Sequence, residues 1–569
     1  MKHTILWILI SCLLSAIAYG NPSGIKVWAT GSTEKVLNSR LSELPHDQVW
    51  DENTNTVQLT GVRGEHVPFH LVISVLEKSA THITLDIGDL RCGDHFLSSG
   101  SVHPFLEHLV TVYAPSGLHG STGRWPDPLV PLTRPFSVPN HWSGKQIRHQ
   151  PLWLDIRVPR DQPPGEYKGT VNINSDQGHL GTITIALNVV DIVLPEERRF
   201  PAHIGYWENH IARMHGLEQD SDEFKELFKA YLTFFLDNRI DPRTPPTMEG
   251  RIENGDYKLN WTRPDLEKLF LEKGRVQFLI SPVPQGIDGP GHEEPFTLEY
   301  EKFVHQHIRQ VIEHARQNGW YDRLVFWIPV DEPKSAVQYE AVRRWADAVK
   351  EVDSEVLVSV TEQPKSENPE WGTLTGHVNS WTVNGNYLFN EADAVTDRAK
   401  AGEFVTWYVS CDQLYPQPNY YIDREAADLR MIPWITWRYK LHGILYWNAT
   451  FWEEVLNPWI DPVSWKWFPC NSPAAGEGSL VYPGHLVERY AKQDNVFGPV
   501  GSLRLALLRE GLEELELLAM LSDLGGEDQA DEIVASICTN VREFSRNPIE
   551  IDEARKQLIS AILELKSAK

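Results

Sequence analysis

The hydrophobic pattern between Asn21 and about Glu197 consists of short alternating runs separated by turn residues. Segments such as "HVPFHLVISV", "LWLDIRVP" and "LGTITIALNVV" have the composition and spacing of β-strands, and no helical period interrupts them. This pattern predicts an antiparallel β-sandwich over residues 21–197. The charged run "LPEERRFP", which carries Pro195 and Pro201, is a plausible linker at its end.

After this linker, short apolar runs alternate with amphipathic helical stretches such as "SDEFKELFKAYLTFFLDN". This alternation predicts repeated βα units and a (β/α)8 TIM-like barrel over residues 198–525. The helical pattern from Leu503 onward would supply the last barrel helix, followed by a helical C-terminal appendage over residues 526–569. The eight predicted strands cover residues 202–207, 238–243, 276–282, 324–330, 355–361, 377–383, 403–410 and 442–448.

The N-terminus has the pattern of a secretory signal peptide. Lys2 precedes an apolar run from Ile5 to Ile17, and the small residues of "AYG" predict cleavage after Gly20. We therefore expect residues 1–20 to be removed and the protein to be exported, to the periplasm or outside the cell. "LISC", ending at Cys12, resembles a lipoprotein cleavage box, but the apolar run continues past it, so lipid anchoring ranks second. No other segment is long and apolar enough to cross a bilayer.

Composition narrows the classes of partner. A net charge of −25 argues against nucleic acid and anionic membrane surfaces, both of which require basic patches. The 21 Trp and 18 Tyr residues fit either an aromatic core or a site for a ligand with flat apolar faces, such as a sugar ring. The histidines and the widely spaced cysteines lack metal-ligand spacing, so we expect no metal or cofactor. One disulfide stays open for an exported chain.

The stretch "FWIPVDEPKS" ends the fourth predicted strand on Asp331 and Glu332. In a (β/α)8 barrel the carboxyl ends of the strands form the working face, which would bring both acids to the mouth. One acid could protonate a leaving group while the other orients a nucleophile that belongs to the substrate, such as a 2-acetamido oxygen. A solvated turn is the alternative interpretation.

The seventh predicted strand is followed by "SCDQ" and carries no Glu that could serve as a second catalytic carboxylate. Asp412 and Glu362, after the seventh and fifth strands, are the other candidates for that role. For Glu362 a solvated loop residue is the favoured interpretation.

Several longer motifs resemble glycoside hydrolase family 123, whose characterised members are β-N-acetylgalactosaminidases. They include "GVRGEHVPFHLVIS", "VDEP", "TWYVSCDQLYPQPNYYID", "EGSLVYPG" and "GPVGSLRLALLREGLEELELL", and the resemblance covers nearly the whole mature chain. It implies that Glu332 is the general acid/base and that Asp331 orients the acetamido group. Glu477 stands where relatives commonly have Asp. The residues expected to bind the sugar are Trp381, Trp407, Tyr408, Tyr415, Asn419, Trp447, Asn448 and Trp452.

The expected function is that of an exported retaining exo-glycosidase, which removes terminal β-linked N-acetylgalactosamine from a glycan by neighbouring-group participation. One alternative is a glycosidase of the same fold that acts on another sugar, with Glu332 paired to Glu362 or Asp412. Another is a carbohydrate-binding protein without catalysis. The sequence leaves open whether the sandwich binds polymer or only buttresses the barrel.

Overall fold

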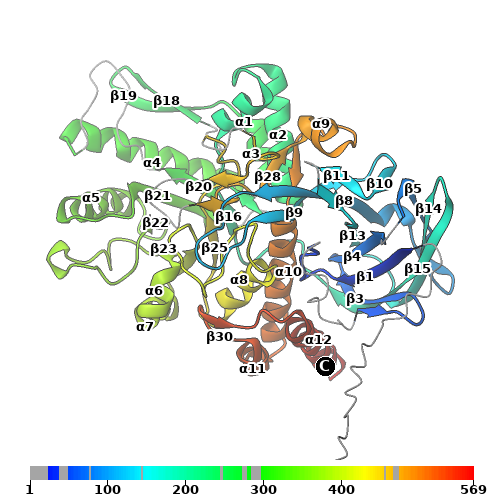
Figure 1. The fold of residues 1–569 in the computed structure, drawn as a ribbon. Coiled ribbons are helices and arrows are strands. Elements are labelled where there is room, and N and C mark those ends of the chain that lie inside the picture. Colours follow the sequence, from blue (N-terminus) through cyan, green and yellow to red (C-terminus); the bar gives the residue numbers. More distant parts are fainter. Residues whose placement is uncertain are drawn as a thin grey trace, which may run out of the picture.

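The computed structural model describes residues 24–37, 49–75, 78–142, 145–243, 248–271, 279–282, 296–453, 457–464 and 473–568. The expected signal peptide 1–20 and Cys12 lie outside these ranges. Figure 1 shows a mostly β N-terminal region and a larger region of parallel strands and helices, with helix α10 (Leu503–Asp523) between them. Within the described part of the chain, no helix has the length and apolar character needed to span a membrane.

The N-terminal region is built from two facing sheets, as the alternating pattern predicts. In β14, Tyr167, Val171 and Ile173 are buried in the core while Glu166 and Lys168 are exposed. The first sheet has the order β1 (Ile25–Gly31), β4 (His66–Val75), β13 (His149–Arg157), β8 (Val102–Val112) and β9 (Gly123–Pro131). The second has the order β10 (Phe136–Val138), β5 (Ala80–Ile87), β14 (Gly165–Ser175), β15 (Gly178–Val193), β3 (Thr56–Arg63) and β2 (Trp50–Asp51), with β6 (Leu90–Cys92) and β7 (His95–Leu97) beside β14.

The larger region contains a curled parallel sheet, and each of the predicted strand runs contributes one strand to it. The strand order is β17 (Asp241–Pro242), β16 (Ala202–Ile204), β25 (Gly443–Tyr446), β24 (Phe404–Tyr408), β23 (Ser380–Asn384), β22 (Leu357–Thr361), β21 (Leu324–Asp331) and β20 (Leu279–Pro282). This is the order of a (β/α)8 barrel opened between its second and third strands. Pairing between β17 and β20, which would close the barrel, is not seen among the described residues.

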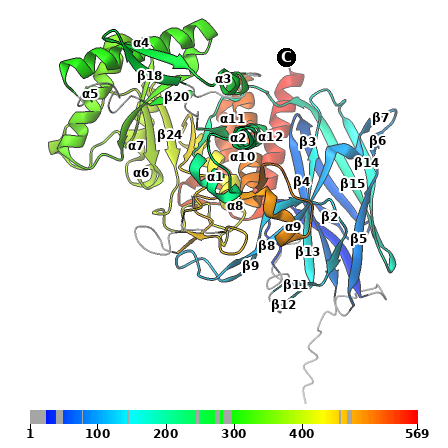
Figure 2. The ribbon, with the colours of Figure 1, turned by 90° about the horizontal axis from the view of Figure 1, so that it is seen from above.

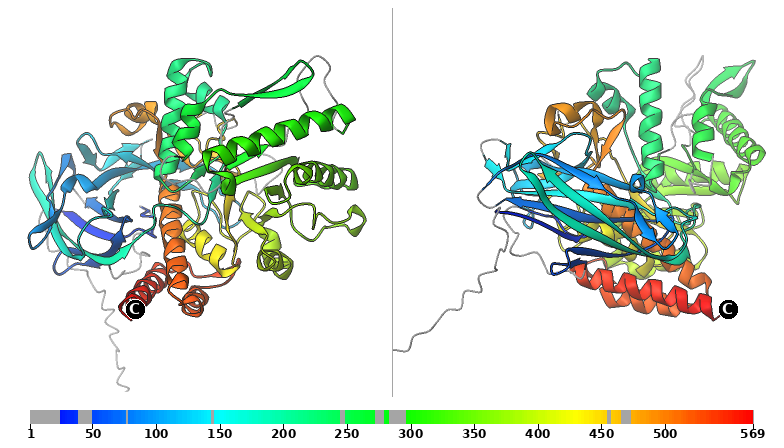
Figure 3. Two further views of the ribbon diagram at one scale, coloured as in Figure 1. Left: turned by 180° about the vertical axis from the view of Figure 1, so that it is seen from behind. Right: turned by 90° about the vertical axis from the view of Figure 1, so that its right-hand side faces the viewer.

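Helices cover the outer side of this sheet, as Figures 2 and 3 show for the green helices. The longer ones begin at side-chain caps: Thr297 accepts a hydrogen bond from the backbone N–H of Tyr300 at the start of α4, and Ser335 caps α5 in the same way. The helices are α1 (Glu208–His215), α2 (Asp222–Asp237), α3 (Pro264–Leu271), α4 (Leu298–Asn318), α5 (Ala336–Val352), α6 (Gly385–Asn390), α7 (Ala392–Lys400), α8 (Ala427–Arg438), α9 (Val487–Ala491), α11 (Glu527–Ile537) and α12 (Pro548–Ser567).

Shorter strands lie outside the two regions' main sheets. The hairpin of β18 (Met248–Glu253) and β19 (Asp256–Trp261) packs beside α4. The remaining short strands include β28 (Val481–Pro483) and β29 (Pro499–Gly501), which pair with each other just before α10. Cys411 is disulfide-bonded, while Cys92 and Cys538 are free.

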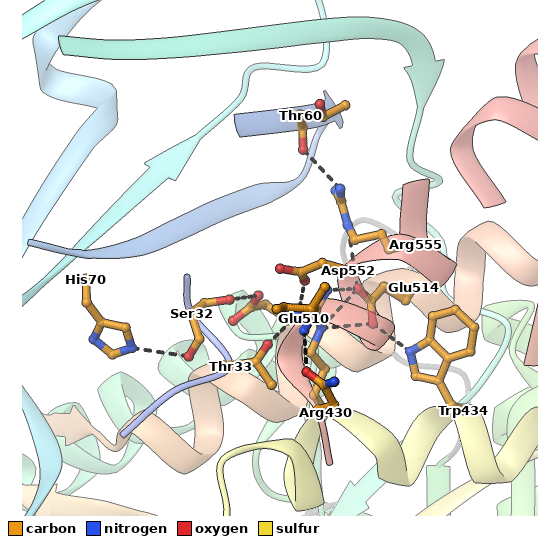
Figure 4. A network of polar contacts seen from close by, with 12 residues as sticks. Ser32, Thr33, Thr60, His70, Arg430, Trp434, Glu510, Glu514, Asp552 and Arg555 are labelled. Atoms are coloured by element: carbon orange, nitrogen blue, oxygen red, sulfur yellow. Dashed lines mark hydrogen bonds and ion pairs between the residues drawn. The ribbon is translucent and has the colours of Figure 1, made fainter. Parts of the chain in front are cut away.

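Helix α10 is buried along almost its whole length, although its sequence is rich in charge. Its acids and arginines pair inside the protein, as Figure 4 shows for the cluster around Glu514. The guanidinium of Arg430 in α8 lies 2.5 Å from Glu514 and 2.7 Å from Asp552 of α12, and Trp434 donates to Glu514 at 2.7 Å. Arg555 of α12 reaches Glu65 of the sandwich at 2.5 Å. Satisfied ionic contacts therefore join three helices to the sandwich.

Candidate active site

Asp331 and Glu332 lie together at the carboxyl end of β21. The backbone of Asp331 still pairs with Thr361 of β22, and the N–H of Glu332 donates to the Thr361 carbonyl at 3.2 Å. Glu332 has a left-handed backbone with a φ of 43°, a conformation that non-glycine residues adopt at a cost and that often marks functional sites. The chain thus turns sharply between the two acids, so they need not point to opposite faces as neighbours in a regular strand do.

Two neighbouring groups hold the carboxylate of Glu332. The hydroxyl of Tyr408, at the end of β24, donates to Oε1, and the ammonium of Lys334 lies 3.2 Å from Oε2. Burial and the charge of Glu332 keep the pKa of Tyr408 well above its usual value, so its hydroxyl stays protonated. Glu332 likewise raises the pKa of Lys334. The Glu332 carboxylate is therefore fixed by a donor from across the sheet and by a cation from its own loop.

The Asp331 carboxyl is exposed at the mouth but partly desolvated by its surroundings. Desolvation raises its pKa, the charge of Glu332 adds to this rise, and a hydrogen bond with Thr361 opposes it. The pKa of Asp331 thus reflects the repulsion expected between adjacent acids. The turn keeps both residues at the carboxyl end of β21.

A polar network extends from Tyr408 along the ends of β23 and β24. Asn384, the last residue of β23, donates at 3.2 Å both to the Tyr408 hydroxyl oxygen and to Oδ2 of Asp412. Asn386 donates to the same Asp412 oxygen at 3.2 Å, and Ser410 donates to Oδ1 at 2.6 Å. The ends of β21, β23 and β24 therefore share one set of hydrogen bonds. Asp412 is part of this network and lies at its solvent-exposed end.

Glu362 is not the solvated loop residue expected from the sequence. It is only 7% exposed, because the chain after β22 carries the side chain inward. Burial raises its pKa to about 8, the nearby charges of Glu367 and Glu332 add to the rise, and the hydrogen bond from the N–H of Gln363 opposes it. Glu362 is therefore mainly protonated at neutral pH and is a neutral acid within electrostatic reach of Glu332.

Aromatic side chains gather where β25 and β16 end. Trp447 follows β25, Trp207 follows β16, and both are half-buried. Their ring centres are 6.3 Å apart, and the buried Phe451 lies 5.0 Å from Trp447 and 5.3 Å from Trp207. The indole N–H of Trp447 donates to Oε1 of Glu477 at 2.7 Å. Of the tryptophans expected to bind sugar, Trp447 is the one that keeps an accessible surface at a strand end.

The structure places the other three expected tryptophans in the core instead. Trp381, Trp407 and Trp452 have no exposed surface. Their indole N–H groups donate to buried or partly buried partners: Glu403 at 2.6 Å, Thr436 at 2.8 Å and Ser479 at 3.0 Å, respectively. Trp407 precedes Tyr408 in β24, and since neighbours in a strand face opposite sides, Trp407 packs toward α8 while Tyr408 reaches Glu332.

The other three residues expected to bind sugar pack within loops and do not form an open surface. They are Tyr415, Asn419 and Asn448. The Tyr415 ring stacks on His119 of the sandwich with centres 4.0 Å apart, and the guanidinium of Arg546 lies 4.8 Å from its centre. The amide of Asn419 is buried and donates to the Ser410 carbonyl at 3.0 Å. The buried Asn448 accepts from the Thr450 N–H at 2.7 Å. The two asparagines are thus enclosed in the loops, and the half-buried Tyr415 ring packs against His119 and Arg546.

Two residues of the site, Asn384 and Lys334, escaped the sequence analysis. Asn384 directly follows the sixth predicted strand, so the signal that singled out Asp331, a polar residue at a strand's end, would have found it. Lys334 stands two residues after Glu332 in the same motif. Glu477, which lies outside the parallel sheet just after the short strand Ala474–Ala475, was noted only as a departure from the family motif. No cluster of metal-ligating side chains occurs in the described ranges.

Two sequence models match the chain in its two regions. The model "Glycoside hydrolase 123, catalytic domain" matches residues 290–521, and "Glycoside hydrolase 123 N-terminal domain" matches residues 42–175. Together they cover more than half of the 569 residues. No curated protein sequence matches the chain.

Among solved structures, a family 123 glycoside hydrolase from Clostridium perfringens, analysed for glycolipid glycan hydrolysis, is similar over 96% of this chain and 97% of its own. Its TM-score is 0.68 and its identity 14%, so this likeness concerns the fold. A family 39 glycoside hydrolase from Bacteroides cellulosilyticus has a TM-score of only 0.33, with 11% identity over 75% of this chain and 80% of its own. Both matched models belong to one family, and the similar fold extends over both regions. The chain is a member of glycoside hydrolase family 123.

Proposed function

We propose that this glycoside hydrolase is an exported, retaining exo-enzyme that removes terminal β-linked N-acetylgalactosamine by substrate-assisted catalysis. The observation that carries the proposal is the adjacent Asp331 and Glu332 at the turn that ends β21. Two carboxyls this close in sequence suit one reaction in which the substrate supplies the nucleophile. The expected signal peptide and the disulfide at Cys411 support export.

In the first step Glu332 gives its proton to the glycosidic oxygen while the bond from that oxygen to C1 breaks. The oxygen of the substrate's 2-acetamido group attacks C1 from the opposite face and closes an oxazoline ring. Asp331 holds the acetamido N–H and stabilises the positive charge that develops on it. In the second step Glu332, now ionised, takes a proton from water, which attacks C1 and restores the acetamido group with overall retention.

The protonation state of Glu362 supports the use of a substrate nucleophile. A carboxyl whose pKa is raised to about 8 is mainly neutral at pH 7, and a neutral carboxyl is a poor nucleophile and a poor base. It can donate a hydrogen bond instead. Glu362 is therefore a weak candidate for the second catalytic carboxylate of a conventional retaining mechanism.

Asp412 keeps a second candidate function open. It is exposed at the mouth and held by Asn384, Asn386 and Ser410. If the natural sugar lacks a 2-acetamido group, Asp412 is the carboxylate that could act together with Glu332. The enzyme would then be a glycosidase of the same fold with another substrate.

A panel of p-nitrophenyl β-glycosides separates the two functions. The proposed enzyme hydrolyses the N-acetylgalactosaminide and leaves galactoside, glucoside and glucuronide intact, because these lack the acetamido nucleophile. The N-acetylglucosaminide, which differs from the N-acetylgalactosaminide in its configuration at C4, tests which of the two configurations the enzyme accepts. Turnover of a sugar without the acetamido group, abolished by Asp412→Asn, would establish the second function instead.

A further inference from the structure

The turn formed by Gly476, Glu477, Gly478 and Ser479, here called the 476–479 turn, lies between the sugar side of the mouth and the domain interface. Both glycines have left-handed backbones, with φ of 83° and 67°. A Cβ on Gly476 would lie 2.8 Å from a guanidinium nitrogen of Arg504, and a Cβ on Gly478 would lie 2.5 Å from the ring of Trp447. The turn is thus in close contact with Arg504 on one side and with Trp447 on the other.

Arg504, at the start of α10, fixes the backbone of this turn. It donates to the Gly476 carbonyl at 2.8 Å and to the Ser479 carbonyl at 2.6 Å. Two further N–H groups form a bidentate pair with Asp127 of β9, with both hydrogen bonds at 2.8 Å, and the fifth donates to the Tyr420 carbonyl at 2.8 Å. Arg504 and Asp127 are both 0% exposed. A carboxylate of the sandwich therefore orients the arginine that holds the turn.

At its other side the 476–479 turn fixes Trp447. Glu477 accepts the indole N–H at 2.7 Å, and the carbonyl of Gly478 accepts from the N–H of Phe451 at 2.8 Å. Burial raises the pKa of Glu477 to about 7, while its contacts with Trp447, Tyr446 and Arg504 oppose that rise. The orientation of the indole at the mouth thus depends on where the turn sits.

We propose that Asp127 and Arg504 are positioning residues, through which the β-sandwich holds Trp447 in place as a platform for the sugar. The platform role of Trp447 rests on the proposed function, whereas the coupling from Asp127 to Trp447 rests on the contacts above. The sandwich thereby acts on the sugar site through a buried ion pair and not through contact with substrate.

The structure supplies a matched control on the same helix. Arg509 of α10 forms a second ion pair with the sandwich, at 2.7 Å from Asp155 of β13, and both residues are almost fully buried. Within the described part of the chain, Arg509 makes no hydrogen bond or ion pair with the 476–479 turn; it also donates to Asn238 at 3.1 Å. Asp155→Asn therefore removes a comparable charge from the same interface without touching the turn.

The first test reads the Trp447 environment without any activity. Full-length protein is labelled with 5-fluorotryptophan, and the Trp447 signal is identified in the 19F NMR spectrum by its loss in Trp447→Phe. We expect Asp127→Asn to shift or broaden this signal and Asp155→Asn to leave it in place, although both lower Tm. Equal effects of the two variants, or none from Asp127→Asn, would overturn the coupling.

The second test measures kcat and KM on whichever aryl glycoside the wild type hydrolyses. We expect Asp127→Asn to raise KM about tenfold with a smaller change in kcat, and Asp155→Asn to leave KM within about twofold. Combined with Trp447→Ala, Asp127→Asn should add little to KM, because both act on one platform. Additive effects would overturn the proposal. If Asp127→Asn does not fold, Arg504→Lys, which keeps the charge but loses hydrogen bonds to the turn, must shift or broaden the Trp447 signal and raise KM.

Failure of the proposed function and failure of the coupling from Asp127 to Trp447 give different results. A wild type that hydrolyses another glycoside but not the N-acetylgalactosaminide refutes the proposed sugar, while the comparison of Asp127→Asn with Asp155→Asn still decides the coupling. A normal N-acetylgalactosaminidase in which both variants behave alike refutes the coupling alone.

Discussion

The two sides of the mouth formed by the curled sheet are built in different ways. On the acid side, at the ends of β21 to β24, Asp331 and Glu332 are held by residues of the same sheet, chiefly Tyr408 and Thr361. On the aromatic side, Trp447 is held by a turn that follows β25 by many residues, and this turn is fixed by α10 and the sandwich. In the proposed function, the chemistry is thus supported locally and the sugar binding from a distance. Changes on the acid side should lower kcat, and changes on the aromatic side should raise KM.

The largest expected effect comes from Glu332→Gln, which removes the proton donor. We expect kcat on a substrate with a poor leaving group, such as an alkyl glycoside, to fall by about 10³ to 10⁴. A dinitrophenyl glycoside, whose leaving group needs no proton, should lose far less in the first step. Steady-state kinetics on both substrates measure the difference. Equal losses on the two substrates would contradict the role of Glu332 as the acid.

Asp331→Asn should reduce kcat by about 10² to 10³ on both kinds of leaving group. The reason is that, in the proposed mechanism, Asp331 stabilises the charge on the acetamido nitrogen, which develops whatever the leaving group is. The same pair of substrates tests this, with circular dichroism to confirm folding. A loss confined to poor leaving groups would assign proton donation to Asp331 and reverse the two roles.

On the aromatic side, Trp447→Ala should raise KM about tenfold and change kcat less, because a stacking platform contributes on the order of 1 kcal/mol to sugar binding. Trp447→Phe is the matched control and should keep most of the affinity. Michaelis–Menten kinetics on the p-nitrophenyl N-acetylgalactosaminide provide the measurement. A fall in kcat with unchanged KM would remove the contrast between the two sides.

The smallest effect on catalysis is expected for Glu362→Gln, which should instead change the pH dependence of stability. The folded-state pKa of Glu362 is raised from 4.5 to about 8, so its contribution to stability is fully present below pH 4.5 and is lost as pH rises through about 8. Glutamine has no carboxyl group and does not titrate in this pH range. The decrease in Tm between pH 5 and pH 8.5 should therefore be smaller in Glu362→Gln than in wild type.

The exposed Glu370 on the neighbouring loop supplies the control, since Glu370→Gln should follow the wild-type curve. Parallel curves for wild type and Glu362→Gln would mean that Glu362 is ionised in the folded protein. A neutral Glu362 near Glu332 would then be excluded, and this residue would again be a candidate for the second catalytic carboxylate.

The sequence predicted those parts of the molecule that depend on local periodicity. Every predicted strand run of the second region contains a strand, and the acids that end the fourth run lie at a strand end in the structure. Trp407 and Tyr408 could not be told apart in this way, because two aromatic neighbours fit a strand equally well until the register assigns their faces. A buried tryptophan and a sugar-binding one have the same composition signal.

The burial of charged side chains was the other feature that could not be predicted from the sequence. Glu362 reads as an ordinary loop acid, and nothing in the sequence marked the charges of α10 as buried, yet both are enclosed. Their burial depends on partners far along the chain: Arg504 meets Asp127, and Arg430 meets Glu514. Periodicity within one segment carries no information about such partners, so the route from the sandwich to Trp447 became visible only in the structure.

The central claim, that the substrate's own acetamido group is the nucleophile, has a direct test. It is the dependence of kcat/KM on fluorination of the N-acyl group, measured with p-nitrophenyl glycosides that carry acetyl, fluoroacetyl, difluoroacetyl and trifluoroacetyl groups. Each fluorine withdraws electrons from the carbonyl oxygen, so substrate-assisted catalysis predicts a steep fall across the series, to almost no turnover of the trifluoroacetyl glycoside. A nearly flat series would show that an enzyme carboxylate attacks C1 and would contradict the mechanism.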